Sequence, residues 1–258
     1  MLAVVVSIPV FVRAHPPIPV SAETMGVYRA IDAVPAGKLV MVHSTWDAAS
    51  VGECEGQCHA IIMHLMKKGV PFVIWTSNPA SPPFYNRIIA AEAKRYGRLY
   101  GRDWADFGFK VPGDQLKFGV QAMAQNFPGF MKADASGTSV SNLPILNDVT
   151  DASRFGLLVS IGYNPTQEFI QFVQAAYGTK VAFAMGALHA TTEISHLDSG
   201  QIVGMLVGAK GGAEYEELME SPGSGVKVIT AQSYAHVFII ALIIAGNVAM
   251  RRAKPEPA

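Results

Sequence analysis

KLVMVHSTWDAASVGECEGQCHAIIMHLMKKGVPFVIW, which runs from Lys38 to Trp75, is the stretch that decides the fold. The short apolar runs at its two ends, Lys38–His43 and Val70–Trp75, predict buried strands. Between them, apolar residues at helical spacing predict a helix that ends at Lys68, because Gly69 favours a helix C-terminus. A strand, a helix and a second strand in succession indicate a βαβ unit with two parallel strands.

The same alternation continues on both sides of this stretch. Further strands are predicted at Ala105–Phe109, Arg154–Gly162, Lys180–Gly186 and Ile202–Gly208. Helices are predicted at Ala22–Ala33 with Ser21 as its cap, Pro83–Tyr96, Asp114–Met123, Pro165–Tyr177, Thr191–Leu197 and Gly211–Met219. Apolar strands separated by helices predict a doubly wound, mainly parallel sheet of about six strands, in a Rossmann-like or flavodoxin-like three-layer α/β sandwich.

Two segments carry more specific expectations. Residues 125–153 are rich in Gly, Pro, Ser, Asn and Asp, so they predict an irregular excursion over the surface or across one end of the sheet. Irregular segments of this length are often functional. The helix at Pro165–Tyr177 is expected to bury one face, formed by Phe169, Phe172, Val173 and Ala176.

A long apolar segment lies near the C-terminus. Ala231–Met250 reads AQSYAHVFIIALIIAGNVAM, and two arginines follow it. About 20 apolar residues are needed to cross the hydrocarbon core of a bilayer. A buried helix of a soluble core would normally show a polar face, whereas Val237–Ile244 is apolar throughout. A transmembrane helix is therefore predicted at 230–250. The positive-inside rule then places the tail, 251–258, in the cytoplasm and the α/β domain, 21–225, outside it, in the periplasm or at the cell surface.

The N-terminal residues 1–13 are also apolar but are too short to span a bilayer. Two interpretations stay open: the segment is the outer end of a first transmembrane helix with a start codon placed too late, or it lies in the membrane interface. The next residues, 14–20, include Pro16, Pro17 and Pro19, which favour an extended connector between membrane and domain.

Charge and cysteine content exclude several classes of function. Lys and Arg together number 20, as do Asp and Glu, and no basic run occurs, so a nucleic-acid partner is not expected. The motif C-x3-C-H at Cys54, Cys58 and His59 is compatible with haem attachment or a metal pair. Both cysteines nevertheless share one helix face with Ile61 and Leu65, which indicates buried thiols. No cofactor and no metal are therefore expected.

Candidate ligand-binding residues follow from the strand assignments, because ligands of open α/β sheets bind beyond the carboxyl ends of the strands. Small hydroxyls, amides, an aromatic ring, an acid and bases at these positions suit a small polar ligand. The candidates are Ser44, Trp46, Asp47, Thr76, Ser77, Asn78, Tyr163, Asn164, His189, Lys210, Gly211 and Gly212.

Catalytic and nucleotide-binding motifs are weak. Gly208–Glu214, GAKGGAE, follows a strand and opens a helix, but it has neither the G-x-G-x-x-G spacing nor a Walker ending. Gly204 and Gly208 are better explained by close backbone packing. His43 and Asp47 form a conceivable acid–base pair, although their positions on the strand argue against contact. The sequence identifies no catalytic residue.

Four segments resemble an uncharacterised family of bacterial and archaeal membrane-anchored α/β proteins. They are Ile18–Ser21, Leu143–Val149, His196–Met219 and Ala231–Asn247. The resemblance spans the domain and the anchor, and it implies an exported Rossmann-like domain held by terminal transmembrane helices. It implies no activity.

Two classes of function follow. The first is a membrane-anchored, extracytoplasmic domain that binds a ligand or a protein, as a subunit of a membrane complex or by self-association through the small residues Ala241, Ala245 and Gly246. The alternative is a membrane-tethered enzyme acting on a small polar substrate at the strand ends, with Asp47, His189 or Lys210 in acid–base roles. A purely structural spacer is a third possibility.

Overall fold

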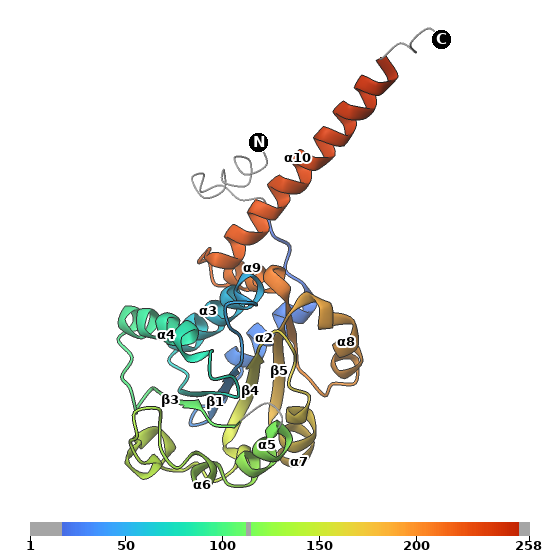
Figure 1. The fold of residues 1–258 in the computed structure, drawn as a ribbon. Coiled ribbons are helices and arrows are strands. Elements are labelled where there is room, and N and C mark those ends of the chain that lie inside the picture. The colour runs from blue at the N-terminus through green and yellow to red at the C-terminus, as the bar shows by residue number, and fades with distance from the viewer. Residues whose placement is uncertain (1–16, 112–114, 253–258) are drawn as a thin grey trace.

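The computed structural model describes residues 17–111 and 115–252, and these form one α/β domain followed by a long helix (Figure 1). The strands are β1 (Leu39–Ser44), β2 (Phe72–Thr76), β3 (Trp104–Phe109), β4 (Phe155–Ile161), β5 (Lys180–Met185) and β6 (Met205–Val207). The helices are α2 (Ala22–Asp32), α3 (Val51–Lys68), α4 (Pro82–Tyr96), α5 (Leu116–Gln125), α6 (Phe127–Met131), α7 (Ala175–Tyr177), α8 (Ala190–Asp198), α9 (Gly208–Leu218) and α10 (Ser224–Arg252). The expectations for residues 1–16, and for a helix start at Asp114, lie outside the described residues.

All six strands are parallel, in the order β3-β2-β1-β4-β5-β6. The chain builds outward from β1 through β2 to β3, then crosses back to place β4 on the other side of β1. This is the strand order of a Rossmann-like sheet, so the predicted fold class is confirmed. The reversal of strand order lies between β1 and β4, and the crevice beyond their carboxyl ends is where such sheets bind ligands.

Two layers of helices cover the sheet and produce two apolar cores. On one face, side chains of α2, α3, α4 and α9 pack against the sheet, as with Ile61 of α3 and Tyr215 of α9. On the other face, α5, α6 and the segment before α7 pack against it, as with Met123 and Phe127. The near-continuous apolar strands are explained by this cover on both sides.

The predicted helix at Pro165–Tyr177 differs in its geometry from expectation. Residues Ile170–Gln174 form a π-helix that leads into α7. A π turn adds a residue per turn and rotates the face that follows it. Phe169 and Val173 are buried as expected, but Ile170 joins them and Ala176 is exposed, so the predicted inward position of Ala176 is wrong.

Three further boundaries differ. The sixth strand is shorter than predicted and starts at Met205. Just before it, Gly204 packs closely on α2, where an added Cβ would lie 2.4 Å from the backbone nitrogen of Val27. Helix α9 starts at Gly208 rather than Gly211. The supposedly irregular residues 125–153 contain α6 and the short 3-10 helices η2 (Val140–Asn142), η3 (Pro144–Leu146) and η4 (Ala152–Arg154).

The segment 125–153 covers one edge of the sheet. The backbone N–H of Ala135 donates to the carbonyl of Asp106 on the edge strand β3, over 2.8 Å. The Asp134 carboxylate accepts a hydrogen bond from the Tyr100 hydroxyl at 2.7 Å. Leu146 and Val149 of this segment are buried in the core. An open strand edge is prone to pairing with other chains, and this cover prevents it.

Helix α10 leaves the layer formed by α3 and α9 and projects away from the domain as a single rod, on the side opposite α5 and α6 (Figure 1). Its residues Ser224–Arg251 form a helix that is long and apolar enough to cross a membrane. It begins earlier than the predicted 230, and its first two turns pack on the domain, where Val226 and Thr230 are buried.

Candidate functional site

Three of the predicted residues, Asp47, Ser77 and Asn78, lie in the loops just after β1 and β2. The Asn78 side-chain amide donates to the Asp47 carboxylate over 3.0 Å. The other Asp47 oxygen accepts the backbone N–H of Ala49 at 2.9 Å. Asp47 and Asn78 therefore join the loops after two neighbouring strands.

His43 is a buried residue of β1 that contacts Ser77, and the sequence did not single it out as a binding residue. Its Nε2 lies 3.2 Å from the Ser77 hydroxyl, and its Nδ1 lies 3.3 Å from the hydroxyl of Ser160, its register partner on β4. Burial lowers the pKa of His43 to about 3. An imidazole with so low a pKa is neutral at physiological pH and is a weak general base. His43 therefore orients Ser77, while Asp47 contacts Asn78 instead.

In the segments after β4 and β5, Tyr163 and His189 form an edge-to-face pair with ring centroids 5.5 Å apart. The Tyr163 ring lies over Gly186, where an added Cβ would come within 2.7 Å of it. Tyr163 and Asn164 are exposed. The aromatic pair joins the loop after β4 to the segment after β5.

Four predicted residues lie inside the protein. Trp46 is fully buried, and its ring packs against Phe84 at 5.4 Å. Ser44 and Thr76 are also fully buried. Gly212 lies against α3, where an added Cβ would be 2.9 Å from the backbone nitrogen of Gln57. These residues contribute to packing around the strand ends.

Lys210 and Gly211 line a separate cavity of about 670 Å³ beyond the carboxyl ends of β5 and β6. Its wall is built from the N-terminal turns of α2, α3 and α9, from the segment after β5, and from the long C-terminal helix α10, which contributes Ile229 and Gln232. Neither Asp47 nor His189 lines it. The sequence places Lys210 and Gly211 at a strand end, but no pattern in it shows that α10 lines the same cavity.

Glu214 is the most connected group of this cavity. One carboxylate oxygen accepts the hydroxyls of Ser21 and Thr24, each at 2.6 Å, and the other pairs with the Lys210 ammonium. Burial raises the pKa of Glu214, but the hydrogen bonds from Lys210, Ser21 and Thr24 outweigh it and lower that pKa overall. Glu214 is therefore an ionised group that joins α9 to the start of α2.

The opposite wall of the cavity carries Glu53, on the first turn of α3. Its carboxylate accepts the backbone N–H of Ala187 at 2.8 Å. Deeper in, the fully buried Gln57 amide donates to the carbonyls of Met185 and Gly208, at 2.9 and 2.8 Å. Gln57 thus holds the ends of β5 and β6 against α3, so the cavity wall is fixed by buried hydrogen bonds.

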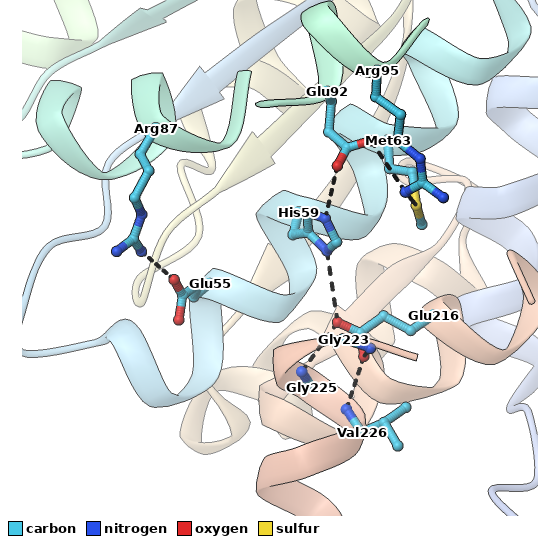
Figure 2. A network of polar contacts seen from close by, with 10 residues as sticks. All are labelled: Glu55, His59, Met63, Arg87, Glu92, Arg95, Glu216, Gly223, Gly225 and Val226. Atoms are coloured by element: carbon cyan, nitrogen blue, oxygen red, sulfur yellow. Dashed lines mark hydrogen bonds and ion pairs between the residues drawn. The ribbon is translucent and has the colours of Figure 1, made fainter. Parts of the chain in front are cut away.

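A second polar cluster lies where α10 meets the domain, and Figure 2 shows it. The buried Glu216 of α9 accepts the backbone N–H groups of Gly223, Gly225 and Val226 at 2.8, 3.1 and 2.8 Å. These N–H groups belong to the first turn of α10 and the residue before it. His59 lies between this carboxylate and Glu92. The sequence drew attention to His59 only as part of the C-x3-C-H motif.

The cysteines of that motif are in the core. Both Cys54 and Cys58 are buried and unpaired, and burial raises the pKa of each thiol to about 12. Within residues 17–111 and 115–252, no group of three or more His, Cys, Asp or Glu side chains is arranged to hold a metal ion.

Comparison with known proteins adds no assignment. No protein-family model matches the chain. A search of curated proteins likewise finds no match.

Proposed function

We propose that this chain is a membrane-anchored α/β domain that binds a small polar ligand, as a subunit of a larger membrane assembly. The observation that carries the proposal is the cavity at the ends of β5 and β6, because the anchor helix itself forms part of its wall. A ligand there would contact the domain and α10 together. The anchor would then respond to occupancy, as expected of a binding subunit rather than of a passive spacer.

The lining indicates the chemistry of the ligand. It carries three carboxylates, Glu23, Glu53 and Glu214, and one ammonium, Lys210, which is already paired with Glu214. Apolar side chains such as Ile194 and Ile229 complete the wall. An excess of negative charge favours a ligand with an amine or several hydroxyl donors over an anion.

We further propose that the domain is extracytoplasmic. Arg251 and Arg252 follow the apolar part of α10, and basic residues favour the cytoplasmic end of a transmembrane helix. A fluorescent protein and an alkaline phosphatase, each fused after Ala258, test this orientation. Fluorescence without phosphatase activity is expected, and the reverse pattern would place the domain in the cytoplasm.

Thermal unfolding of the full chain in phosphatidylcholine nanodiscs tests ligand binding. The probes are ethanolamine, spermidine, glucose and acetate, added singly. A ligand at about 100 times its Kd stabilises a protein by about 2.7 kcal/mol, so binding raises the Tm. We expect an amine or the sugar to raise the Tm, and acetate to leave it unchanged.

Two variants on the same helix decide whether the shift comes from the cavity. Glu53→Gln removes a cavity carboxylate, whereas Glu55→Gln removes a neighbouring one that pairs with Arg87 outside it. The shift should be lost in Glu53→Gln and kept in Glu55→Gln. An equal shift in both variants, or none in the unmodified protein with any probe, would refute binding of this class of ligand in the cavity.

A further inference from the structure

The junction between α10 and the domain is held by a carboxylate at the N-terminus of α10. The first turn of any helix leaves N–H groups without helical partners. In α10, the Glu216 side chain accepts two of these, from Gly225 and Val226, and also the N–H of Gly223 just before the helix. Glu216 is fully buried, so its charge depends on these bonds and on nearby cations.

His59 is the group that supplies such a cation. Its Nδ1 lies 4.0 Å from one Glu216 oxygen, and its Nε2 lies 3.2 Å from a Glu92 oxygen. Figure 2 shows the ring between these two carboxylates, one from α9 and one from α4. When His59 is protonated, both ring nitrogens carry a hydrogen, and each nitrogen faces one buried carboxylate.

None of the other charged groups described around the His59 ring supplies a positive charge to Glu216. On α4, Arg95 approaches the far oxygen of Glu92 at 3.7 Å, and about half of its side chain is exposed. On α3 itself, Glu55 pairs with Arg87 one turn away. From α10 and the segment before it, backbone N–H groups contact Glu216. Among the contacts described, His59 is therefore the only ionisable partner of Glu216.

Beyond this cluster, α10 contacts the domain through its first turns. Gly225 packs so closely on α9 that an added Cβ would lie 2.7 Å from the backbone nitrogen of Ala213, and Val226 and Thr230 are buried nearby. From His236 onward the helix projects from the domain (Figure 1). Loss of favourable charge at its first turn should therefore affect α10 more than the sheet, which has its own cores.

We propose that His59 is a proton-dependent latch: its protonated ring holds α10 in its docked position on α9, and loss of the proton loosens that docking. The direction follows from linkage. The nearby Glu216 carboxylate raises the pKa of His59, burial lowers it, and the hydrogen bond to Glu92 raises it again, with a net increase over 6.5. A raised pKa stabilises the docked state at low pH, and that contribution is lost as the pH rises through the raised value.

Spin labels on the full chain in nanodiscs test the latch. Labels at Val228→Cys on α10 and Lys94→Cys on α4 occupy exposed positions, and the native cysteines are buried. Distances are measured by pulsed electron paramagnetic resonance at about pH 5.5 and about pH 9, on either side of the ordinary histidine pKa. We expect one narrow distance distribution at the lower pH and a loss of that narrow peak at the higher pH.

Three substitutions separate the latch from a general effect of pH. His59→Gln cannot carry a proton and should give the broad distribution at both pH values. His59→Lys keeps a positive charge and should restore the narrow peak at both. His196→Gln on α8, a histidine outside the cluster, should behave like the unmodified protein.

Several outcomes would overturn the latch. One is a spin-label distance distribution that does not change with pH in the unmodified protein. Another is a pH response in His59→Gln that equals that of the unmodified protein. Should His59→Gln fail to fold, the ring is titrated by NMR in the unmodified protein. An apparent pKa below the ordinary value of 6.5 would then refute the proposal.

Discussion

The hydroxyl of Ser21 donates to the carboxylate of Glu214 over 2.6 Å, and this bond joins residues 193 positions apart in the chain. Ser21 also caps α2, since its side chain accepts the N–H of Thr24. The first helix is therefore fixed to α9 through the residue that starts it. The same helix α9 carries Glu216 two positions later, so two of its three glutamates attach the first and the last described helices.

Removal of the Glu214 carboxylate should be costly. Glu214→Ala leaves the buried hydroxyl of Thr24 and the N–H of Ser21 without their acceptor. A lost hydrogen bond to a charged group costs about 1.5–3 kcal/mol, so we expect a loss of that order in the free energy of unfolding. Glu214→Gln keeps an acceptor and should lose less. Chemical denaturation in nanodiscs measures both, and equal losses would contradict the role of the hydrogen bonds.

The depressed pKa of Glu214 predicts a pH dependence of its own. Its contribution to stability is present above the ordinary glutamate pKa of 4.5 and is lost as the pH falls through the lowered value. Unfolding measured at pH values from neutral to acidic should show a smaller acid sensitivity in Glu214→Gln than in the unmodified protein. An identical acid sensitivity would show that Glu214 is not perturbed in this way.

His43 should destabilise the fold in acid. Its pKa is about 3 in the folded protein and about 6.5 in the unfolded chain, so the unfolded state takes up a proton first as the pH falls. Stability should decline from pH 6.5 downward, by a few kcal/mol in total. His43→Gln removes this component while keeping polar atoms near Ser77. NMR titration should find the ring of His43 neutral at pH 5, and a protonated ring there would be contrary evidence.

Close packing of α10 makes Gly225 sensitive to substitution. Gly225→Ala adds a Cβ that would lie 2.7 Å from the backbone of α9, so the helix must shift. Overpacking of this type costs about 1–3 kcal/mol. Gly246→Ala on the same helix meets nothing within 4 Å and is the matched control. We expect a lower Tm only for Gly225→Ala, and a similar Tm for both variants would argue against tight docking.

The buried cysteines should be inert in the native state. Thiolate is the reactive form of cysteine, and burial with a pKa of about 12 leaves almost none at neutral pH. A thiol reagent should modify neither Cys54 nor Cys58 until denaturant is added. Rapid modification of the folded protein would show that the helix face of α3 is open.

Most of the fold could be predicted from local patterns. Apolar runs such as Leu39–Ser44 are explained by burial on both faces, and Gly69 ends its helix in the left-handed conformation that glycine favours. The errors have local causes that depend on distant residues. The π-helix at Ile170–Gln174 rotates a helix face without a signal in composition, and no local pattern shows that α2 packs on Gly204 next to the start of β6.

The candidate site was less predictable. Strand ends pointed to Asp47, Asn78 and Lys210, and the structure places these residues beyond the ends of the strands. The cavity and the His59 cluster depend on how α10 returns to α9, which no pattern within either helix encodes. A buried acid in an otherwise amphipathic helix, such as Glu216, was the available signal, because an isolated buried charge requires partners.

Helix α10 has 29 residues and a length of about 43 Å without a break, from its capped first turn to its basic end. A protein tethered by a flexible linker tumbles freely above a bilayer, whereas this one would tilt and rotate together with its anchor. While α10 is docked on α9, the domain would then present the same side to the lipid. A change in membrane thickness or in the packing of neighbouring helices would reach the α/β domain as a change in its orientation.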